Sequence, residues 1–416
     1  MDKIRKLTRK DFAGYVDIVA NAYPGFKVET DKQKRDLVKR LIETERESSG
    51  INSFGYFRDG RLLGAIRLYD FEMTMFDGIL DVGGGGLLAV GLPYKKERVA
   101  KELMVFFNRF FAERSFCMTT LHPFRPDFYR KMGYGYGTKN NRYQIRSTDI
   151  PAGNSKEHIR FLDKRNEKAM IDCYNRVAAK THGMIKKCPF ETRRFFGPGN
   201  RVIGYKEKRK ILGYVIFKFR MLDGESFIGQ DIEIIEMMYE NPEVFRELMT
   251  FLRTQADQVR SIIFTTQEEY LHFLPTDPRD ETRNMMVPIL HQSNIQGVGI
   301  MYRIINVRRL FALLKGHNFG GRDCRLKLTI TDSFIPANSG SYIIHFDQGT
   351  ARLRQKAAFE VEVRIDISEF ASLVMGVVDF RSLWKYGLAD ISDTGYIETV
   401  NGIFLCDTKP VCTTMF

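Results

Sequence analysis

Cysteine is scarce in this chain: its six cysteines are scattered along 416 residues, and no pair has the Cys-x-x-Cys spacing of a redox or zinc motif. This scatter argues against a disulfide framework and favours free, buried thiols. Histidine is also rare, because the seven histidines stand singly and form neither a His-x-His nor a His-Glu-x-x-His pair. The sequence therefore predicts no metal site.

Long apolar runs are absent as well. No segment approaches the roughly 18 uninterrupted apolar residues that a membrane-spanning helix needs, and the charged first residues lead into no apolar stretch of signal-peptide length. We therefore expect a cytoplasmic protein with no membrane partner. The composition, 44% apolar and 28% charged, is that of a folded chain, and the length predicts more than one hydrophobic core.

Acidic residues are outnumbered, which gives a formal net charge of +13. Residues 1–150 carry 27 lysines and arginines against 19 acidic residues, so the basic charge is concentrated in this part of the chain. A polyanionic cofactor or a nucleic acid would find it there. A solvated basic surface explains the same charge, and without a motif it is the favoured interpretation.

The segment between residues 53 and 114 predicts strands followed by a helix. Residues 53–73 have the pattern of a hairpin around an Asp59-Gly60 turn. Residues 79–92 form a second extended run with four consecutive glycines at 83–86, which is typical of a close approach by a backbone or a ligand. Residues 96–114 space apolar side chains by three and four positions, as in a helix with one buried face.

The chain continues with a short strand at 117–121, a loop at 122–126, a short helix at 127–132 and an extended tail that ends near Arg146. Strand, helix and strand in this order predict an α/β sheet with a crossover connection. A weaker copy of the same order spans residues 201–265 and indicates a duplicated fold. This copy has no glycine-rich or basic run before its helix, so we expect no cofactor there.

Beyond about residue 290 the pattern changes. Short strand-like runs separated by turn residues alternate with helical segments at 306–314 and 367–375, which predicts a third domain of the α+β class.

Residues 90–101 form a candidate anion site, because a strand end, a basic loop and a helix start follow one another here. The first turn of a helix has unpaired N–H groups and the positive end of the helix dipole, and Lys95, Lys96 and Arg98 add charge. On spacing alone, a solvent-exposed helix start is an equally good interpretation.

The run 87–100 resembles the acetyl-CoA motif of the GNAT superfamily, a strand followed by Gln/Arg-x-x-Gly-x-Gly/Ala. Lys95 stands at the first basic position and Ala100 at the last small position, while Arg98 replaces the usual glycine. Downstream, residues 128–134 read Phe-Tyr-Arg-Lys-Met-Gly-Tyr, and they resemble the superfamily's Phe-Tyr-x-x-x-Gly-Phe/Tyr element with every key position filled.

Over essentially its whole length the chain resembles the enhanced intracellular survival (Eis) acetyltransferases. This resemblance implies a mixed α/β and α+β fold with two tandem GNAT folds, each a mixed sheet with flanking helices, followed by a sterol carrier-like domain. The expected domains are a catalytic GNAT domain at 1–150, a degenerate GNAT domain at 151–290 and a sterol carrier protein-like domain at 291–416. The resemblance also implies a homohexamer.

The resemblance implies two catalytic residues. The tyrosine of the Phe-Tyr element, Tyr129, would protonate the departing thiolate, because a phenol with a reference pKa of about 10 can donate to a desolvated thiolate. A core tyrosine with a satisfied hydroxyl is the alternative. The terminal carboxylate of Phe416 would be the general base and would reach the active site, since the apolar, uncharged end of the chain suits a docked terminus. A disordered tail is the alternative here.

The resemblance further assigns the acetyl-CoA contacts. The backbone of Leu88, Ala89 and Val90 would pair with the pantetheine arm and hold the thioester carbonyl. The residues expected around the pyrophosphate and the arm are Lys95, Lys96, Glu97, Arg98, Val99, Ala100, Lys101, Phe124 and Arg125. Tyr23 and Phe26 are candidates for an acceptor pocket, although core packing is the favoured interpretation of both.

The implied reaction is transfer of an acetyl group from acetyl-CoA to an aminoglycoside, a polyamine or a lysine-like amine. Two other functions stay open. A sterol carrier-like domain suits a protein that binds a lipid or another apolar ligand, and the net charge of +13 would suit nucleic acid. The acetyltransferase is favoured, and nucleic acid ranks last.

Overall fold

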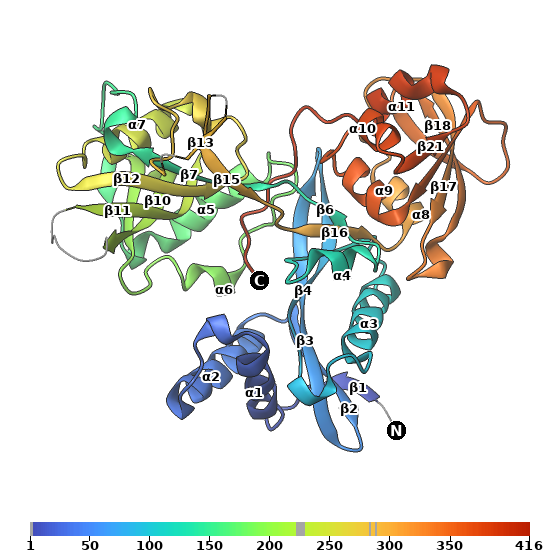
Figure 1. Ribbon diagram of the computed structural model, residues 1–416, viewed down its shortest axis with the longest axis horizontal. Coiled ribbons are helices and arrows are strands. Elements are labelled where there is room, and N and C mark those ends of the chain that lie inside the picture. Colours follow the sequence, from blue (N-terminus) through green and yellow to red (C-terminus); the bar gives the residue numbers. More distant parts are fainter. Residues whose placement is uncertain (1–2, 222–228, 283, 288) are drawn as a thin grey trace. The chain divides into compact units, whose positions relative to one another are not determined.

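The computed structural model describes residues 3–221, 229–282, 284–287 and 289–416, which form two compact units (Figure 1). The first unit contains the chain up to Gly137, then Ile300–Pro410 and Met415–Phe416. The second contains Thr138–Gly299 and Val411–Thr414. Each unit is built from segments that lie far apart in the sequence.

The first unit has a seven-stranded sheet within the described residues. The strand order is β1 (Lys3–Lys6), β2 (Ile51–Arg58), β3 (Arg61–Met75), β4 (Gly78–Val90), β5 (Met118–Leu121), β16 (Met301–Ile304) and β6 (Gly135–Tyr136). The predicted hairpin is present, because β2 and β3 are joined through Asp59 and Gly60, which both have positive φ, as a tight two-residue turn requires. Strands β4 and β5 are parallel and are connected by a helix.

Helices cover both faces of this sheet (Figure 1). The helices and short 3-10 turns are α1 (Phe12–Ala22), η1 (Pro24–Phe26), α2 (Asp31–Glu47), η2 (Leu92–Tyr94), α3 (Val99–Glu113) and α4 (Pro126–Arg130). Helix α3 packs with Ile66 and Leu68 of β3 in one core cluster, whereas α1 and α2 pack with Ala65 in another. Because neighbouring strand residues point to opposite faces, α3 lies on one side of the sheet and α1 and α2 lie on the other.

A five-stranded sheet belongs to the same unit, and we call it, with its helices, the carboxy-terminal layer. Its strand order is β19 (Thr350–Arg354), β18 (Gly340–Asp347), β17 (Cys324–Thr331), β20 (Val361–Asp366) and β21 (Ala389–Ile391). Its helices and turns are α8 (Val307–Leu313), η6 (Pro336–Asn338), α9 (Ile367–Val374), α10 (Phe380–Lys385), η7 (Thr394–Tyr396) and α11 (Ile397–Phe404).

Aromatic rings fill the interior of the carboxy-terminal layer. The rings belong to Phe311, Phe319, Phe346, Phe370 and Phe404, with centroid separations of 5.3–6.4 Å. All five side chains are buried. The space between the sheet and the helices is therefore occupied by side chains of the protein itself.

The second unit has its own seven-stranded sheet among the residues that the structure describes. The order is β15 (Asn294–Gly297), β7 (Asn140–Arg146), β12 (Val259–Thr266), β11 (Gln230–Tyr239), β10 (Lys210–Met221), β9 (Arg201–Glu207) and β8 (Ile159–Phe161). The accompanying elements are η3 (Ser147–Asp149), η4 (Lys164–Asn166), α5 (Glu167–Ala178), α6 (Pro189–Thr192), α7 (Pro242–Arg253), η5 (Leu271–Phe273) and a hairpin of β13 (Met285–Met286) and β14 (Leu290–His291).

The two large sheets exchange one strand. Strand β7, which the sequence places at the end of the first sheet, pairs with β12 and β15 in the second sheet. Strand β16 takes the corresponding place in the first sheet, between β5 and β6. The units consequently divide after Gly137 and Gly299, whereas the sequence patterns suggest boundaries at 150 and 290. The periodicity of a strand does not determine which sheet it joins, and this explains the difference.

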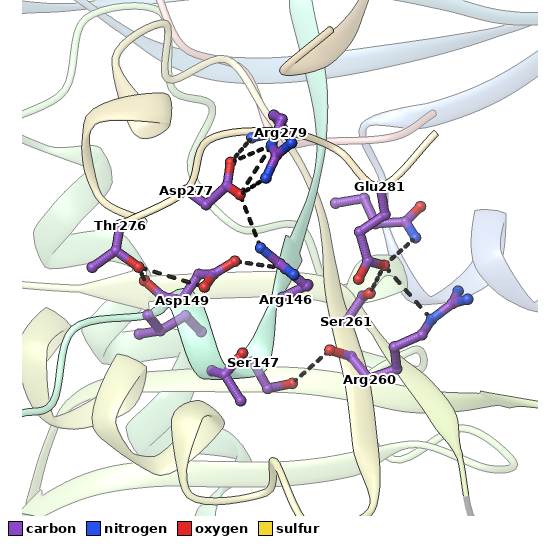
Figure 2. A network of polar contacts seen from close by, with 12 residues as sticks. Arg146, Ser147, Asp149, Arg260, Ser261, Thr276, Asp277, Arg279 and Glu281 are labelled. Carbon is purple, nitrogen blue, oxygen red and sulfur yellow. Dashed lines mark hydrogen bonds and ion pairs between the residues drawn. The ribbon is translucent and has the colours of Figure 1, made fainter. Parts of the chain in front are cut away.

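A polar network holds the segment 276–281 on the second sheet (Figure 2). Arg146, the last residue of β7, donates to Asp149 at 2.7 Å and to Asp277 at 2.9 Å, and Arg279 also pairs with Asp277. Glu281 accepts from the Ser261 hydroxyl and faces Arg260. The network ties a connecting segment to two strands.

Candidate active site

The end of β4 is free on the side that faces β5. The two strands pair from Val82–Met118 to Gly85–Leu121, where β5 ends, while β4 continues for five residues to Val90. The backbone of Leu88, Ala89 and Val90 is thus beyond the reach of the β5 ladder. An extended ligand with amide groups can pair with such a strand end.

A β-bulge directs the backbone at this strand end. The register between β3 and β4 shifts between Ala65 and Arg67, and Leu87 has a φ of 47°. The Tyr15 hydroxyl donates to the Leu87 carbonyl at 2.7 Å, and the Tyr23 hydroxyl donates to the Leu88 carbonyl. Tyr15 lies on α1 and Tyr23 is the residue that caps the end of this helix, so α1 and its end fix the orientation of the bulge.

The loop from β4 to α3 has the features of an anion site. Lys95, Lys96, Arg98 and Lys101 are exposed, and the acidic Glu97 is paired with Arg58 at 2.6 Å. Lys96 and Arg98 have φ values of 69° and 65°, so the backbone at the motif's glycine position adopts the left-handed conformation that glycine favours.

Helix α3 starts without a side-chain cap. Arg98 is the N-cap residue, and its side chain accepts no hydrogen bond from the helix. The first N–H groups of an α-helix have no partner within the helix, so those of Val99, Ala100 and Lys101 remain available to an anion. The basic loop and this helix start fit a pyrophosphate.

The corresponding start of α7 in the second unit is closed. The Asn241 side chain accepts from the N–H groups of Glu243 and Val244, each at 3.0 Å, and Glu243 puts a negative charge in the first turn. Strand β11 ends at Tyr239, so only Glu240 and Asn241 connect it to α7. A capped, acidic helix start after a short connection disfavours a phosphate group.

Tyr129 lies on α4 and is buried, with 7% of its surface exposed. Its ring contacts Phe128 and Tyr134 edge-on at 5.2 and 6.1 Å. Burial raises the pKa of Tyr129 well above its ordinary value, and the nearby Tyr23 and Tyr134 add to this shift. The phenol therefore stays protonated and can act as a proton donor.

Phe416 lies on the face of the first sheet that α1 and α2 cover. Its ring packs edge-on against Tyr69 and Phe71, with centroids 5.5 and 4.8 Å away, and lies 5.0 Å from the His122 ring. A Cβ built on Gly86 would lie 2.9 Å from the terminal carbon of Phe416. The end of the chain is thus docked beside β4.

The four consecutive glycines of β4 each make room for a different group. A Cβ on Gly83 would meet the Phe111 ring, and one on Gly85 would meet the Phe107 ring, both from α3. On the opposite face, Gly84 admits Phe71 and Gly86 admits Phe416. Close approach by aromatic rings and by the chain end explains the run.

Phe124 and Arg125 border α4 on the surface. Phe124 is 69% exposed and packs edge-on against Tyr23 at 5.6 Å, and Tyr23 in turn stacks on Phe26 at 5.4 Å. Arg125 makes a two-pronged ion pair with Asp127, so part of its charge is already balanced. Tyr23 is half-buried and packs against the core cluster of α1 and α2, whereas Phe26 is exposed. Both rings lie with Phe124 in one aromatic group.

The structure places the predicted residues in three neighbouring features of the first unit: the strand end, the basic loop with its helix start, and the α4 region. The sequence patterns did not predict that Tyr15 hydrogen bonds to the β-bulge or that Gly86 admits the end of the chain. Neither Tyr15, on α1, nor the contact of Gly86 with Phe416 left a local signal of its role in the sequence.

No group of three or more His, Cys, Asp or Glu side chains in the described residues is placed to hold a metal ion. Among the helices of the described segments, none is long and apolar enough to cross a membrane.

Three family matches cover most of the chain. Residues 3–137 and 183–304 each match an acetyltransferase (GNAT) domain family, and residues 309–413 match a sterol carrier protein domain family. A search of curated proteins found no match.

Solved structures share the fold over the full length of both chains. A GCN5-related N-acetyltransferase from Anabaena variabilis superposes with a TM-score of 0.82 at 17% identity, each chain covered to 100%. A probable N-acyltransferase from Enterococcus faecalis gives 0.80 at 21%, and Eis1 from Mycobacterium abscessus gives 0.78 at 18%, both with full coverage of the two chains.

The predicted fold class is therefore confirmed, and the chain is an acyltransferase of the GNAT superfamily. More narrowly, two acetyltransferase domains precede a sterol carrier protein domain in this chain, and the whole chain shares its fold with Eis1.

Proposed function

We propose that this chain transfers an acetyl group from acetyl-CoA to an amine by direct attack, with Tyr129 as general acid and the carboxylate of Phe416 as general base. The position of Phe416 carries the proposal. Its terminal carbon lies against Gly86, two residues before the strand end that is expected to hold the thioester. A carboxylate there is placed to accept a proton from an amine that attacks at Leu88–Val90.

Donor binding follows from the strand end and the basic loop. The backbone of Leu88, Ala89 and Val90 beyond the β5 ladder would pair with the pantetheine arm, which would replace the Tyr23 hydroxyl at the Leu88 carbonyl. The N–H groups of this segment would stabilise the developing oxyanion. The pyrophosphate would lie on the helix start at Val99 to Lys101, with the charge of Lys95, Lys96 and Arg98 around it. Phe124 would border the arm, and Arg125 would supply the charge that Asp127 leaves unbalanced.

Each proposed step moves one proton or one bond. The Phe416 carboxylate accepts a proton from the ammonium form of the acceptor, and the neutral nitrogen then bonds to the thioester carbon. The carbon–sulfur bond breaks, and the sulfur takes the proton of the Tyr129 hydroxyl. The second proton that the nitrogen loses as the amide forms returns to the Tyr129 phenolate. Because burial raises the pKa of Tyr129, the phenol is protonated when the sulfur leaves.

The acceptor that this site suits best is an amine with one positive charge and an apolar or aromatic body. Tyr69, Phe71 and His122 surround Phe416, so an amine at its carboxylate meets rings. Three carboxylates of the first unit face arginines: Glu45 faces Arg67, Asp127 faces Arg125 and Glu369 faces Arg130. Additional ammonium groups of a polyamine or an aminoglycoside would have to compete with these arginines.

A panel of amines tests the acceptor class. We expect kcat/KM for phenethylamine to exceed that for spermidine by at least about tenfold, the factor that about 1.4 kcal/mol of aromatic contact supplies. A higher value for spermidine would reject the single-charge acceptor while leaving the acetyl transfer itself in place.

Substitution of Tyr129 tests the mechanism. Tyr129→Phe should lower kcat about 100-fold, which is typical of losing a general acid, and leave the calorimetric affinity for acetyl-CoA unchanged. Tyr386→Phe is the matched control, because Tyr386 is 66% exposed in the carboxy-terminal layer. Unchanged turnover in Tyr129→Phe would refute its role.

The pH dependence is a further test of Tyr129. A general acid is active in its protonated form, and the raised pKa of Tyr129 keeps this form populated as the pH rises past the ordinary value of a tyrosine. We expect kcat to show no fall on the alkaline side up to about pH 10. An alkaline fall between pH 7 and about 9 that disappears in Tyr129→Phe would contradict the shift.

The competing function is the binding of a lipid or another apolar ligand by the carboxy-terminal layer. The five phenylalanines inside that layer weigh against it, because they occupy the space such a ligand needs. Co-purified lipid together with no calorimetric binding of acetyl-CoA would favour the lipid function. A homohexamer is part of the proposal, and sedimentation tests it.

A further inference from the structure

Helix α4 needs support from outside itself. It has five residues, and helices this short are unstable without tertiary contacts. The turn that follows is tied back to Tyr129, whose carbonyl accepts from Met132 N–H at 2.9 Å and from Tyr134 N–H at 3.2 Å. The orientation of the Tyr129 ring therefore depends on what holds this turn.

Three polar contacts join α4 and the turn to the carboxy-terminal layer or to the strand just before it. On α4 itself, Arg130 forms an ion pair with Glu369 of α9, whose side chain is 6% exposed. Beyond the turn, the Ser372 hydroxyl of α9 donates to the Tyr136 carbonyl at 2.9 Å.

The third contact is buried. Arg303 of β16 donates to the Met132 carbonyl and makes a two-pronged ion pair with Asp332 at 2.8 and 2.6 Å. Both side chains are 0% exposed. Asp332 also accepts from the N–H groups of Phe334 and Ile335, so its orientation is fixed by the carboxy-terminal layer.

The glycines of this turn allow the close approach that these contacts require. A Cβ on Gly135 would lie 2.1 Å from the Ser368 carbonyl oxygen, and one on Gly133, which has a φ of 77°, would overlap the Arg303 guanidinium. The catalytic turn and the carboxy-terminal layer are thus packed backbone to backbone.

We propose that the carboxy-terminal layer is a positioning element for proton transfer: Glu369, Ser372 and the Arg303–Asp332 pair hold the α4 turn so that the Tyr129 hydroxyl meets the leaving sulfur. This inference rests on the proposed role of Tyr129 as general acid. It gives the sterol carrier domain a task in catalysis that requires no bound lipid. The four side chains are positioning residues, because they act through Tyr129.

A double-mutant cycle tests the proposal. Glu369→Gln in the full chain should lower kcat about tenfold with an unchanged KM for acetyl-CoA, since a small displacement of a catalytic group is costly. In a Tyr129→Phe background the same change should lower kcat less than about twofold, because a displaced phenyl ring has no proton to lose. Ser372→Ala, a smaller change that keeps the fold, should follow the same pattern.

Glu362→Gln is the matched control. Glu362 is a buried carboxylate of the same layer that pairs with Lys327 and accepts from Thr329, without contact to α4. Its substitution should leave kcat within about twofold of the parent even if it lowers the melting temperature.

A second readout uses the leaving group. With an acetyl aryl thioester, whose thiolate leaves without protonation, the deficits of Glu369→Gln and Tyr129→Phe should both shrink. Three results would overturn the positioning role: kcat losses that add in the double mutant, the same kcat loss with acetyl-CoA and with the aryl thioester, or a kcat loss in Glu362→Gln equal to that in Glu369→Gln.

The outcomes also separate the two proposals. If Tyr129→Phe keeps full turnover, the general acid and the positioning role fail together. If Tyr129→Phe is defective and Glu369→Gln is normal, only the positioning role fails.

Discussion

At the scale of single residues, an absent side chain matters as much as a present one. Gly86 admits the terminal carbon of Phe416, and an added methyl group would lie 2.9 Å from that carbon and 3.2 Å from its oxygen. We expect Gly86→Ala to displace the carboxylate and to lower kcat about 100-fold, since a misplacement of about 1 Å can cost that much.

Gly78→Ala is the control for this prediction. Gly78 lies on the same strand, and its added methyl group would be 3.7 Å from the Met75 carbonyl oxygen, an ordinary contact. Steady-state kinetics with acetyl-CoA measures both variants. Equal activity of Gly86→Ala and the parent protein would exclude Phe416 as the base.

Arg98 stands where the motif that this segment resembles has glycine, and its backbone has a conformation that glycine favours. With a φ of 65°, a residue that has a Cβ is strained by about 1 kcal/mol. Arg98→Gly should therefore raise the free energy of unfolding by up to about 1 kcal/mol and weaken acetyl-CoA binding through the lost charge. Denaturant unfolding and calorimetric titration measure the two effects. Arg98→Asn is the control, because asparagine tolerates this φ and also lacks the charge, and its affinity for acetyl-CoA should match that of Arg98→Gly. If Arg98→Gly is less stable than the parent protein, Arg98 is not strained.

At the scale of elements, the sequence predicted what depends on local pattern. The turn at Asp59 and Gly60, the amphipathic helix α3 and the Phe-Tyr element on α4 carry their information in neighbouring residues. The exchange of β7 and β16 could not be predicted this way, because pairing partners far apart in the chain leave no mark on the periodicity of a strand. The contact between Gly86 and Phe416 joins positions 330 residues apart, so the glycine run indicated a close approach without naming the partner.

The network at segment 276–281 gives an element-scale prediction (Figure 2). Hydrogen bonding to Arg279 lowers the pKa of Asp277 to about 2, so the carboxylate stabilises the fold above its ordinary pKa and loses this effect as the pH falls toward 2. Asp277→Asn should cost roughly 0.5–1 kcal/mol at pH 7, discounted for its partial exposure. That cost should shrink in 1 M salt. Thermal melts at low and high salt measure this loss of stability, and Asp257→Asn, at an exposed position, is the control. A loss that does not depend on salt would mean that the ion pair is not its cause.

At the scale of the whole molecule, the family-matched domains and the compact units of the structure have different boundaries. The first acetyltransferase domain takes β16 as a strand of its sheet, and the Arg303–Asp332 pair is fully buried between that strand and the carboxy-terminal layer. A sheet cannot lose an inner strand and stay intact, so the first domain and the carboxy-terminal layer should unfold in one transition. The second unit has its own core and should unfold in a second transition.

Calorimetry with two core variants tests this division. Leu326→Ala, in the carboxy-terminal layer, and Leu248→Ala, in the second unit, each remove a fully buried side chain at a cost of about 2–5 kcal/mol. We expect Leu326→Ala to lower the midpoint temperature of one transition and acetyl-CoA to raise the midpoint of that same transition, because a ligand stabilises the unit that binds it. Leu248→Ala should lower the other transition. A third transition, lowered by Leu326→Ala and unmoved by acetyl-CoA, would mean that the carboxy-terminal layer unfolds independently and cannot hold the α4 turn.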